Sequence, residues 1–599
     1  MVKKLLTGNE AVARGAYEAG VKFASAYPGT PSTEILESIA KYKGELYAEW
    51  APNEKVAYES AFGASLAGVR SLATMKHVGV NVAADPLFTS VYTGVTGGIV
   101  LVSADDPGMH SSQNEQDNRH YALAAKLPML EPSDSEESYE LIKLAYDISE
   151  RFNTPVLFRM TTRVCHSRSL VETGERVERE DIPYEKNIKK YVATPANAHI
   201  MRPALIERLK DLREYSETEA VSLGVNRAEW ADDKSVGVVT SGVSYQYAKD
   251  AFGEDVSYLK LGMTNPLPLD LIKDFASKVG KLYVVEELDP YLEDQLKQEG
   301  IEVIGKEVIP VWNELNADIV ANAVFGRTEA QEKSSELVAV PRPPAMCAGC
   351  PHRGLFYVLS SHNKKHDDLM ITGDIGCYTL SSAPPLSAID SCICMGASIS
   401  MGHGAAKISK THRVVSVIGD STFLHTGVNS LMNAVYNSSN LITIILDNRI
   451  TAMTGQQQNP GTGFTLQGEV APEVDIPLLC KSFGFGEGAI HVVNPLDLGQ
   501  TEAALEKALE TDGPSVIITK WPCVLKKMNE EDRKAFDLAK RTCRVDQEKC
   551  KKCKLCLACG CPAIYNGDEI TIEQESCTGC KVCQQICPFD AIEVIENGK

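Results

Sequence analysis

Short apolar runs alternate with amphipathic stretches in the N-terminal part of the chain. Residues 9–20 have the apolar periodicity of a helix, and residues 23–27 (FASAY) have the composition of a strand. Residues 97–104 (GGIVLVSA) predict a buried strand that ends in a polar loop. This alternation of strands and helices predicts an α/β fold with a largely parallel sheet.

The same pattern returns twice further along the chain. Residues 236–241 and 281–287 predict strands of a second, smaller α/β domain. Residues 414–418 and 441–446 predict neighbouring strands of a third domain, with a helix at 427–436 between them. We therefore expect an α/β protein with several domains of this kind.

Changes in composition divide the chain into six parts. A charged, weakly patterned stretch separates the first two α/β domains, and a charged and then proline-rich stretch separates the second from the third. The expected parts are an α/β domain at 1–170, a helical connector at 171–234, a smaller α/β domain at 235–330, a linker at 331–345, an α/β domain at 346–540 that ends in a charged helix at 530–540, and a cysteine-rich tail at 541–599.

Composition limits the cellular location and the classes of partner that we expect for the protein. The chain has 599 residues and a formal net charge of −20, which disfavours nucleic acid as a partner. Half of its 18 cysteines lie at 550–587, and the others are scattered, as is usual in a reducing cytoplasm. We read no apolar signal segment at the N-terminus, and no apolar run approaches the roughly 18 residues of a membrane helix. We therefore expect a cytoplasmic protein without a membrane partner.

The tail contains two C-x2-C-x2-C runs, each followed by a Cys-Pro pair. Three thiolates on one tight loop suit an iron–sulfur cluster, and in two-cluster ferredoxins the cysteine before proline binds the other cluster. Zinc and disulfides are the alternatives, but zinc sites rarely carry this tandem spacing. The expected [4Fe–4S] ligand sets are Cys550, Cys553, Cys556 and Cys587 for one cluster, and Cys577, Cys580, Cys583 and Cys561 for the other.

The first of these runs departs from the usual spacing. Four residues rather than three separate Cys556 from Cys561, and an additional cysteine, Cys559, lies in this gap and competes as a ligand. The proline that follows Cys561 matches the proline that follows Cys587, which favours Cys561.

A second chemical site is predicted in the third α/β domain. Gly419, Asp420 and Ser421 follow one strand, and Asn448 follows the next. Because the carboxyl ends of neighbouring parallel strands meet at one edge of a sheet, Asp420 and Asn448 are expected to face one ion. A carboxylate, an amide oxygen and the backbone carbonyl of Ile450 are donors that magnesium prefers. An ordinary strand–turn–helix with a capping aspartate is the alternative.

This arrangement resembles the thiamine diphosphate motif, in which GDG is followed after just under thirty residues by NN. Here the two ends are GDS and DN, so each departs by one residue. Thiamine chemistry also needs a glutamate that hydrogen-bonds the aminopyrimidine ring and activates the cofactor. Glu54, shortly before the small-residue stretch at 61–68, is the predicted glutamate, and capping of that helix is its alternative role.

Further stretches resemble the 2-oxoacid:ferredoxin oxidoreductases, and together they cover essentially the whole chain. They are YPGTPSTE (27–34), NEKVA with GASLAG (53–68), CAGCPHRG (347–354) and GDIGC (373–377). Three others resemble more narrowly the large (α) subunits of the branch that acts on indolepyruvate. They are TMKHVGVNVAADP (74–86), DDPGMHSSQNEQDNR (105–119) and CICMGASISMGHG (392–404).

The resemblance implies a pyrimidine-binding domain, a transketolase C-like domain, a diphosphate-binding domain and a ferredoxin-like domain, in that order. It implies that an aryl-2-oxoacid, typically indolepyruvate, is decarboxylated on thiamine diphosphate. Two electrons then pass singly through iron–sulfur clusters to ferredoxin, and the acyl group passes to coenzyme A. The family default also implies a small β subunit as partner and an α2β2 assembly.

Three competing hypotheses stay open at this stage. One is a sister enzyme that acts on a different oxoacid. The second is a non-redox thiamine decarboxylase or ligase, against which the tail cysteines argue. The third is an electron-transfer protein with an inactive front end, against which Glu54, Asp420 and Asn448 argue.

The resemblance also implies a third cluster, proximal to thiamine. Related enzymes place its ligands where this chain has Cys347, Cys350, Cys377 and Cys523. Buried free thiols are the alternative for these four residues. The remaining cysteines are Cys392 and Cys394, which are alternative ligands, and Cys165, Cys480 and Cys543, which we expect to be structural.

Cofactor and substrate contacts are expected in the loops that face the active site of the family. Thr454, in the TGQQ segment, and His352 are expected beside the cofactor. Arg119 could pair with the substrate carboxylate, and a surface arginine is its equal alternative. The other expected contacts are Tyr27–Ser32, His77 and Asn81.

Overall fold

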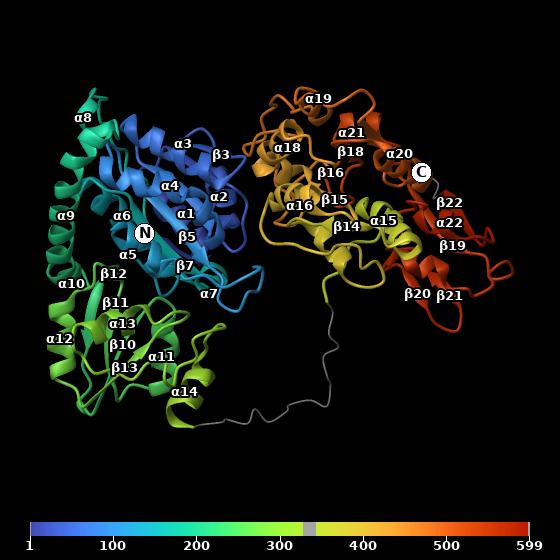
Figure 1. The fold of residues 1–599 in the computed structure, drawn as a ribbon. Coiled ribbons are helices and arrows are strands. Elements are labelled where there is room, and N and C mark those ends of the chain that lie inside the picture. The colour runs from blue at the N-terminus through green and yellow to red at the C-terminus, as the bar shows by residue number, and fades with distance from the viewer. Residues whose placement is uncertain (1, 327–342, 597–599) are drawn as a thin grey trace. The chain divides into compact units, whose positions relative to one another are not determined.

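A computed structural model of the chain describes residues 2–326 and 343–596. The chain forms two compact units, Met1–Glu336 and Leu337–Lys599 (Figure 1). Of the predicted linker at 331–345, residues 331–342 lie outside the described residues.

The first unit is built on a seven-stranded sheet. Its strands are β2 (Phe23–Ala26), β3 (Tyr47–Trp50), β4 (Ser71–Lys76), β5 (Ile99–Asp105), β6 (Met129–Leu130), β7 (Val156–Thr161) and β12 (Met263–Asn265). Their order is β12-β6-β7-β5-β4-β2-β3, and every pair is parallel except β12 with β6. Strands β4, β5 and β7 are buried throughout, as expected of a parallel sheet covered on both faces. The predicted parallel α/β fold is confirmed.

Helices alternate with these strands along the chain. They are α1 (Gly8–Glu18), α2 (Thr33–Ile39), α3 (Glu54–Leu66), α4 (His77–Thr93), α5 (Arg119–Ala125), α6 (Ser135–Arg151) and α7 (Thr162–His166). Local sequence explains where they begin. Thr7 forms a capping box with Glu10 at α1, and the side chain of Asn53 accepts a hydrogen bond from the Val56 N–H at α3.

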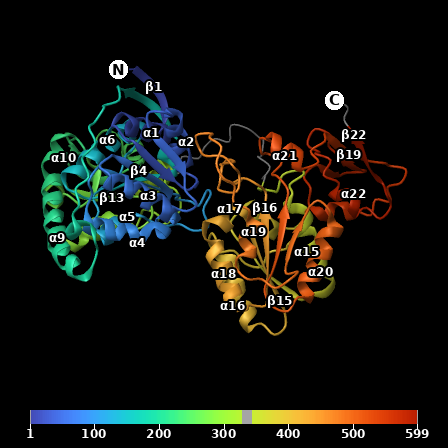
Figure 2. The ribbon, with the colours of Figure 1, turned by 90° about the horizontal axis from the view of Figure 1, so that it is seen from above.

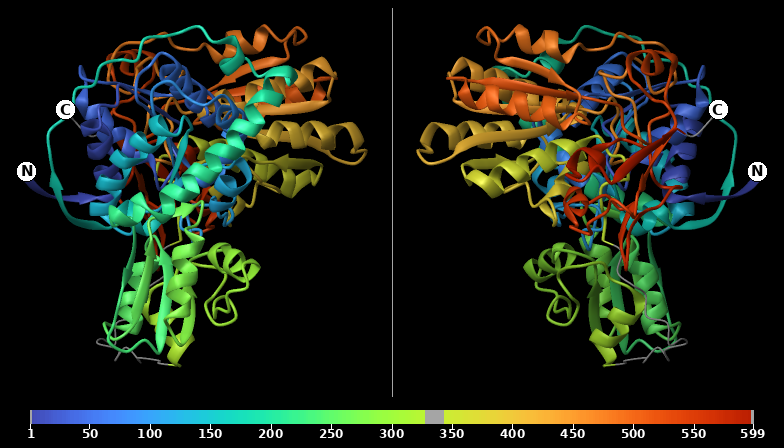
Figure 3. Two further views of the ribbon diagram at one scale, coloured as in Figure 1. Left: turned by 90° about the vertical axis from the view of Figure 1, so that its left-hand side faces the viewer. Right: turned by 90° about the vertical axis from the view of Figure 1, so that its right-hand side faces the viewer.

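A smaller sheet completes the first unit, and Figure 3 shows it below the larger one. Its strands are β9 (Asn226–Glu229), β10 (Val236–Ser241), β11 (Ser257–Leu261) and β13 (Lys281–Val285), in the order β13-β10-β11-β9. Its helices are α11 (Ser244–Phe252), α12 (Leu269–Ser277), α13 (Tyr291–Gln298) and α14 (Ala317–Phe325). Strand β12 leaves this domain and pairs with β6, which ties the two sheets together.

The connector between the two sheets is shorter than the predicted 171–234. It contains the helices α8 (Ile188–Tyr191), α9 (Pro195–Glu217) and α10 (Glu219–Ser222), and the antiparallel ribbon of β1 (Val2–Thr7) and β8 (Arg168–Thr173) precedes it. Strand β9 already belongs to the smaller sheet, because it pairs with β11. Its polar sequence, NRAE, lacks the apolar pattern of a strand, which explains why sequence analysis placed it in the connector.

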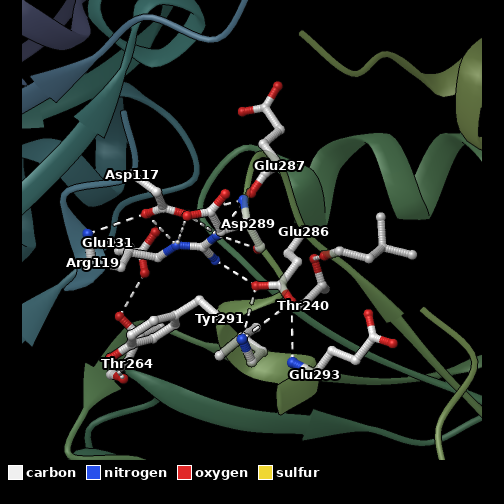
Figure 4. Close-up of polar contacts among 12 residues, drawn as sticks. Asp117, Arg119, Glu131, Thr240, Thr264, Glu286, Glu287, Asp289, Tyr291 and Glu293 are labelled. Carbon is white, nitrogen blue, oxygen red and sulfur yellow. Dashed lines mark hydrogen bonds and ion pairs between the residues drawn. The ribbon is translucent and has the colours of Figure 1, made fainter. Parts of the chain in front are cut away.

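Arg119, the first residue of α5, is buried where the two sheets of the first unit meet (Figure 4). Its Nη1 donates to Glu286 Oε2 at 2.6 Å, and its Nε donates to Asp117 Oδ1 at 2.9 Å. Its Nη2 donates to the backbone oxygens of Glu287 at 2.7 Å and Asp289 at 3.0 Å. Burial lowers the pKa of Arg119, but the carboxylates of Asp117 and Glu286 outweigh burial and hold the pKa well above its ordinary value.

These contacts contradict both roles considered for Arg119 from the sequence. Each nitrogen of the guanidinium already donates to a buried oxygen, so the group is neither at the surface nor available to a substrate carboxylate. Arg119 instead joins the loop before α5 to the loop after β13. The predicted substrate contact of this residue is wrong.

The second unit contains a five-stranded parallel sheet. Its strands are β14 (Leu369–Thr372), β15 (Arg413–Gly419), β16 (Leu441–Asp447), β17 (Ile490–Val493) and β18 (Ser515–Lys520), in the order β14-β15-β16-β18-β17. Its helices are α15 (His352–His366), α16 (Ala397–Ile408), α17 (Asp420–Thr422), α18 (Val428–Tyr436), α19 (Ile476–Lys481), α20 (Leu498–Glu510) and α21 (Glu530–Ala535). The predicted strands and the helix between them are confirmed, whereas the helix expected at 530–540 ends at Ala535.

The cysteine-rich tail belongs to the same unit as this sheet, and Figure 2 shows it beside α20 and α21. It consists of β19 (Arg541–Val545), a 3-10 turn (Leu555–Cys559), β20 (Ile564–Asn566), β21 (Ile570–Ile572), α22 (Val582–Ile586) and β22 (Ile592–Glu596). Ile564, Ile572 and Val582 of the tail belong to the same apolar core as Leu355 and Phe356 of α15. The tail is therefore packed onto the third α/β domain.

No helix in the described part of the chain combines the length and the apolar character that crossing a membrane requires.

Replacing Arg119 with methionine is expected to destabilise the first unit. Glu286 would lose the arginine of its ion pair, and Asp117 would keep only the more distant Arg159 at 3.8 Å. Removing one partner of a buried pair costs about 3–5 kcal/mol. Urea unfolding should reveal this loss. Arg151→Met is the matched control, because the pair that Arg151 makes with Glu219 is exposed and worth about 1 kcal/mol or less. An Arg119→Met protein as stable as the control would contradict this role.

Candidate functional site

Two carboxylates meet at the carboxyl end of the sheet in the second unit. Strands β15 and β16 are neighbours, and Gly419 pairs with Leu446. Asp420 and Asp447 are the next residues along the chain, so they lie beside one another at the same edge of the sheet. Asp420 is 2% exposed, and its Oδ2 has no hydrogen-bond partner in the described residues. Burial raises the pKa of Asp420 well above its ordinary value, and the neighbouring Asp447 raises it further. This edge therefore holds two buried carboxyl groups that are unfavourable as free anions, one of which has an oxygen left to coordinate a cation.

Asn448 lies directly beyond β16 and is held from two sides. Its Oδ1 accepts from the Ile450 N–H at 3.1 Å, and its Nδ2 lies 3.3 Å from Nε2 of His352. Burial lowers the pKa of His352 to about 4, so its ring is neutral at pH 7. The structure thus brings Asp420, Asn448 and His352 to one site.

The loop that follows β16 has a fixed shape. Arg449 has a φ of +59° and pairs with Glu473 at 2.8 Å, which anchors the loop from outside. Inside it, Thr451 donates to the hydroxyl of Ser421 at 2.8 Å. Thr454, a predicted cofactor contact, donates to Gln457 at 2.6 Å within the same loop.

A π-helical turn lies at Phe423–Gly427 just before α18, a feature frequent at functional sites.

The four cysteines of the predicted proximal cluster lie near one another beside this site. Burial raises the pKa of Cys350 to about 12, and the thiols of Cys523 and Cys377 add to the shift. Burial likewise raises the pKa of Cys377 to about 11, with Cys523 and Cys347 adding to it. The Cys523 N–H donates to the backbone oxygen of Asn448 at 3.0 Å, which links this group to the carboxylate site. Mutually close thiols of this kind suit a metal cluster, which binds them as thiolates.

The two alternative ligands have different neighbours. Burial raises the pKa of Cys392, and Asp374 and Cys394 contribute further. Asp374 is itself buried and accepts hydrogen bonds from the N–H groups of Gly396 and Ser398, both at or near the start of α16. This carboxylate therefore fixes the segment that carries both cysteines.

The tail contains two cavities, each lined by one of the predicted ligand sets. The first is lined by Cys550, Cys553, Cys556 and Cys587. The second is lined by Cys561, Cys577, Cys580 and Cys583, together with Cys543 and Cys559. The cysteines of the tail therefore form two separate groups in space. In each group, the cysteine that precedes a proline lies beside the C-x2-C-x2-C run to which it does not belong in the sequence, which is the crossed ligand pattern of two-cluster ferredoxins.

Cys559 is buried, whereas Cys561 is only partly buried. The thiol of Cys559 is 1% exposed and donates to the backbone oxygen of Cys556 at 3.1 Å. Burial raises the pKa of Cys559 to about 12. The cysteines expected to be structural, Cys165, Cys480 and Cys543, are all buried, and the Cys543 N–H donates to the sulfur of Cys577 at 3.2 Å.

Glu54 lies in the first unit, at the start of α3. Its side chain is buried against Gly79 of α4, where a Cβ atom would lie 2.8 Å from Glu54 Oε1. The residue that caps α3 is Asn53, which accepts from the Val56 N–H at 2.9 Å. The capping alternative therefore does not explain why an acidic residue of the first turn is buried here.

Other predicted contacts gather at the carboxyl ends of β2 and β4. His77 is fully buried, its Nε2 lies 3.3 Å from the Asn114 backbone oxygen, and its Nδ1 has no partner in the described residues. The loop Tyr27–Ser32 follows β2, and its Gly29 packs against the side chain of Lys76. Asn81 is exposed and bonded to Gln116 at 3.0 Å.

Sequence analysis overlooked Lys76, which lies beside His77. Its Nζ is buried and donates to the Ser111 backbone oxygen at 2.7 Å. Burial lowers the pKa of Lys76 to about 8, and Asp106 offsets part of the shift. A lysine at the end of the apolar strand β4 was the signal that could have identified it.

Comparison with protein families identifies three parts of the chain. Residues 14–223 match the thiamine-diphosphate-binding domain of pyruvate flavodoxin/ferredoxin oxidoreductases. Residues 374–519 match the C-terminal TPP-binding domain of thiamine pyrophosphate enzymes, and residues 570–593 match a 4Fe-4S binding domain. These matches cover the regions of Glu54, of Asp420 and of the second cysteine run.

Curated relatives match over nearly the whole chain. Indolepyruvate oxidoreductase subunit IorA of Archaeoglobus fulgidus is 41% identical, over 99% of this chain and 97% of the relative. The proteins of the same name from Methanothermobacter marburgensis and Thermococcus kodakarensis are 42% and 39% identical, over 98% and 99% of this chain and 97% of each relative. This chain therefore belongs to the family of indolepyruvate oxidoreductase subunit IorA.

Proposed function

We propose that this chain is the large subunit of an enzyme that oxidises aryl-2-oxoacids such as indolepyruvate. One oxoacid, one coenzyme A and two oxidised ferredoxins would give one arylacetyl-CoA, one CO2, two reduced ferredoxins and one proton. The names of the full-length relatives and the matched thiamine and 4Fe-4S domains support this reaction. A panel of other 2-oxoacids tests it against a sister enzyme of different specificity.

The observation that carries the proposal is the buried, unpartnered Oδ2 of Asp420 beside Asp447. A magnesium ion held by Asp420, Asn448 and the backbone carbonyl of Ile450 would stabilise the ionised form of Asp420 and hold a diphosphate. When bound there, thiamine diphosphate supplies the carbon nucleophile that the cleavage of a 2-oxoacid needs. The donor set fits the magnesium ion.

In the first unit, Glu54 is proposed to hydrogen-bond the aminopyrimidine ring and exchange a proton with it. Gly79 keeps the space beside this carboxylate clear, because any Cβ at that position would clash with Glu54. Nε2 of His77 lies 3.3 Å from the Asn114 carbonyl, which favours the tautomer in which Nε2 carries the proton. Burial lowers the pKa of His77 to about 4, so its ring is neutral at pH 7. The ring can therefore orient a hydrogen-bonding group of the bound ligand without adding a positive charge to the site.

Lys76 is proposed to bind the substrate carboxylate in place of Arg119. Its ammonium is buried, and none of the ion pairs in the described residues includes it. A buried cation without a carboxylate partner is well suited to an anionic ligand. Its position between the Tyr27–Ser32 loop and Ser111 places it among the predicted substrate contacts.

The remaining components follow from the cysteines and from the family. Two [4Fe–4S] clusters in the tail and a third at Cys347, Cys350, Cys377 and Cys523 would carry electrons singly to ferredoxin. The relatives are named as subunits, which supports a partner chain. A small β subunit in an α2β2 assembly is our proposal for it.

Glu54→Gln is expected to lower oxoacid- and coenzyme A-dependent turnover by about 10²–10⁴-fold, because the amide cannot exchange the proton. Bound thiamine diphosphate, measured by fluorescence after oxidation to thiochrome, should stay at the wild-type level. Glu59→Gln on the same helix is the control, since Glu59 is exposed and forms an i,i+4 pair with Lys55. Full turnover of the Glu54→Gln enzyme would refute the catalytic role.

Asp420→Asn should prevent the magnesium-dependent retention of thiamine diphosphate. The amide removes the charge that the cation would balance, so thiamine content after desalting should fall by about tenfold or more. Asp475→Asn is the control, because asparagine can still cap α19 there. Equal cofactor retention in both variants would count against the site.

Cys561→Ser should remove up to one tail cluster, whereas Cys559→Ser should not. Loss of a ligand thiolate removes up to four irons and sulfides per chain from a [4Fe–4S] site. Iron and sulfide analysis of anaerobically purified protein, with the electron paramagnetic resonance spectrum of the reduced enzyme, distinguishes the two. The reverse result would assign the ligand to Cys559.

A further inference from the structure

The two cysteine runs of the tail carry very different charges. The chain as a whole has a net charge of −20, yet residues 549–554 (KCKKCK) contain four lysines and no acidic residue. The corresponding positions of the second run, residues 576–581 (SCTGCK), contain one lysine. We name the exposed lysines Lys551, Lys552 and Lys554 the basic rim.

Backbone geometry does not explain these lysines. Lys552 has a φ of +51°, a conformation that favours glycine, and the second run has a glycine, Gly579, with a φ of +63° at the equivalent position. A lysine there carries a backbone penalty that glycine avoids. The first run therefore keeps a cation where the second run uses the residue that best fits the backbone.

The basic rim surrounds one cavity and not the other. The charged residues that line the cavity of Cys550, Cys553, Cys556 and Cys587 are Lys551 and Lys554. Neither lysine ammonium makes a hydrogen bond or ion pair within the described residues, whereas Lys549 pairs with Glu593 at 2.9 Å. Two positive charges at this cavity are thus left uncompensated.

The ligand set of this cavity includes an exposed cysteine, whereas the cysteines of the second set are intermediate or buried. Cys553 is exposed, and the apolar side chains of Leu555 and Phe589 nearby are 48% and 44% exposed. The second cavity is lined partly by Ala348, Gly349 and Arg353 of the third α/β domain. The first ligand set is therefore the more exposed of the two to an external protein.

We propose that the basic rim, with Leu555 and Phe589, is the docking surface for an acidic one-electron carrier protein. The inference rests on the proposed function, in which such a carrier takes the electrons. One electron would leave the cluster held by Cys550, Cys553, Cys556 and Cys587, and the carrier's own cluster would be reduced by that electron. Opposite charges steer the encounter, and a small apolar contact permits rapid release, as in transient electron-transfer complexes.

The test reverses two charges and measures binding directly. Lys551→Glu/Lys554→Glu is prepared as the complete anaerobic enzyme with its partner subunit, and titrated by calorimetry with an oxidised, acidic two-[4Fe–4S] ferredoxin. The Kd should rise about tenfold or more at 20 mM salt, and the difference should shrink to about threefold or less at 0.5 M salt. Lys551→Arg/Lys554→Arg should bind as the wild type does.

Two controls separate this inference from general effects. Lys410→Glu/Lys481→Glu changes the net charge equally, but these exposed lysines lie outside the tail, so its Kd should stay within about twofold of wild type. Iron content and the spectrum of the reduced clusters must be unchanged in the Lys551→Glu/Lys554→Glu enzyme. An unchanged ferredoxin Kd in that enzyme would overturn the docking surface.

The outcome also distinguishes this inference from the proposed function. Wild-type enzyme that fails to reduce methyl viologen with indolepyruvate and coenzyme A would refute the function itself. Viologen reduction with unaltered ferredoxin binding by the reversed variant would refute the docking surface alone. Loss of the partner subunit on purification of that variant would instead assign the rim to a subunit interface and would also overturn the proposal.

Discussion

The second unit depends on acidic groups that are held away from water and close to one another. Asp420 and Asp447 share one sheet edge, and burial raises the pKa of both carboxyl groups, with Asp447 raising that of Asp420 further. The cysteine groups repeat this arrangement with thiols. Such clusters are unfavourable for the chain alone and become favourable when cations neutralise them. Cofactor binding and the stability of this unit are therefore expected to be linked.

Direct contacts hold the tail, with its cysteine groups, against the domain that carries Asp420. Arg353 of α15 donates to the backbone oxygens of Cys559 at 2.7 Å and Met346 at 2.7 Å, so one side chain joins the tail to the loop before α15. Gly349 of that loop packs so closely on Thr578 that a Cβ would lie 1.9 Å from its hydroxyl. Contacts within one core, and not a flexible linker, therefore fix the tail against the domain that carries Asp420.

Prediction from the sequence succeeded where a single type of residue indicates a single structural feature. Strands β15 and β16 were predictable because they are buried, continuous apolar runs, and the turn after each followed from parallel topology. Cysteine spacing predicted both tail groups because covalent reach restricts which thiols share a cluster. Polar elements were harder to predict. Strand β9 has no apolar pattern, and the pairing that defines it comes from β11, which is distant in the sequence.

Arg119 shows why charged residues resist prediction from sequence alone. An arginine in a loop of the family could bind a substrate or face solvent, and nothing local indicates that its partners Glu286 and Glu287 lie some 170 residues away. The structure gives it an indirect role. The loop that Arg119 ends supplies the backbone oxygens of Ser111 and Asn114, which lie against Lys76 and His77. By fixing the end of this loop, Arg119 helps to position both residues, and so the ion network between the two sheets supports the site at β4.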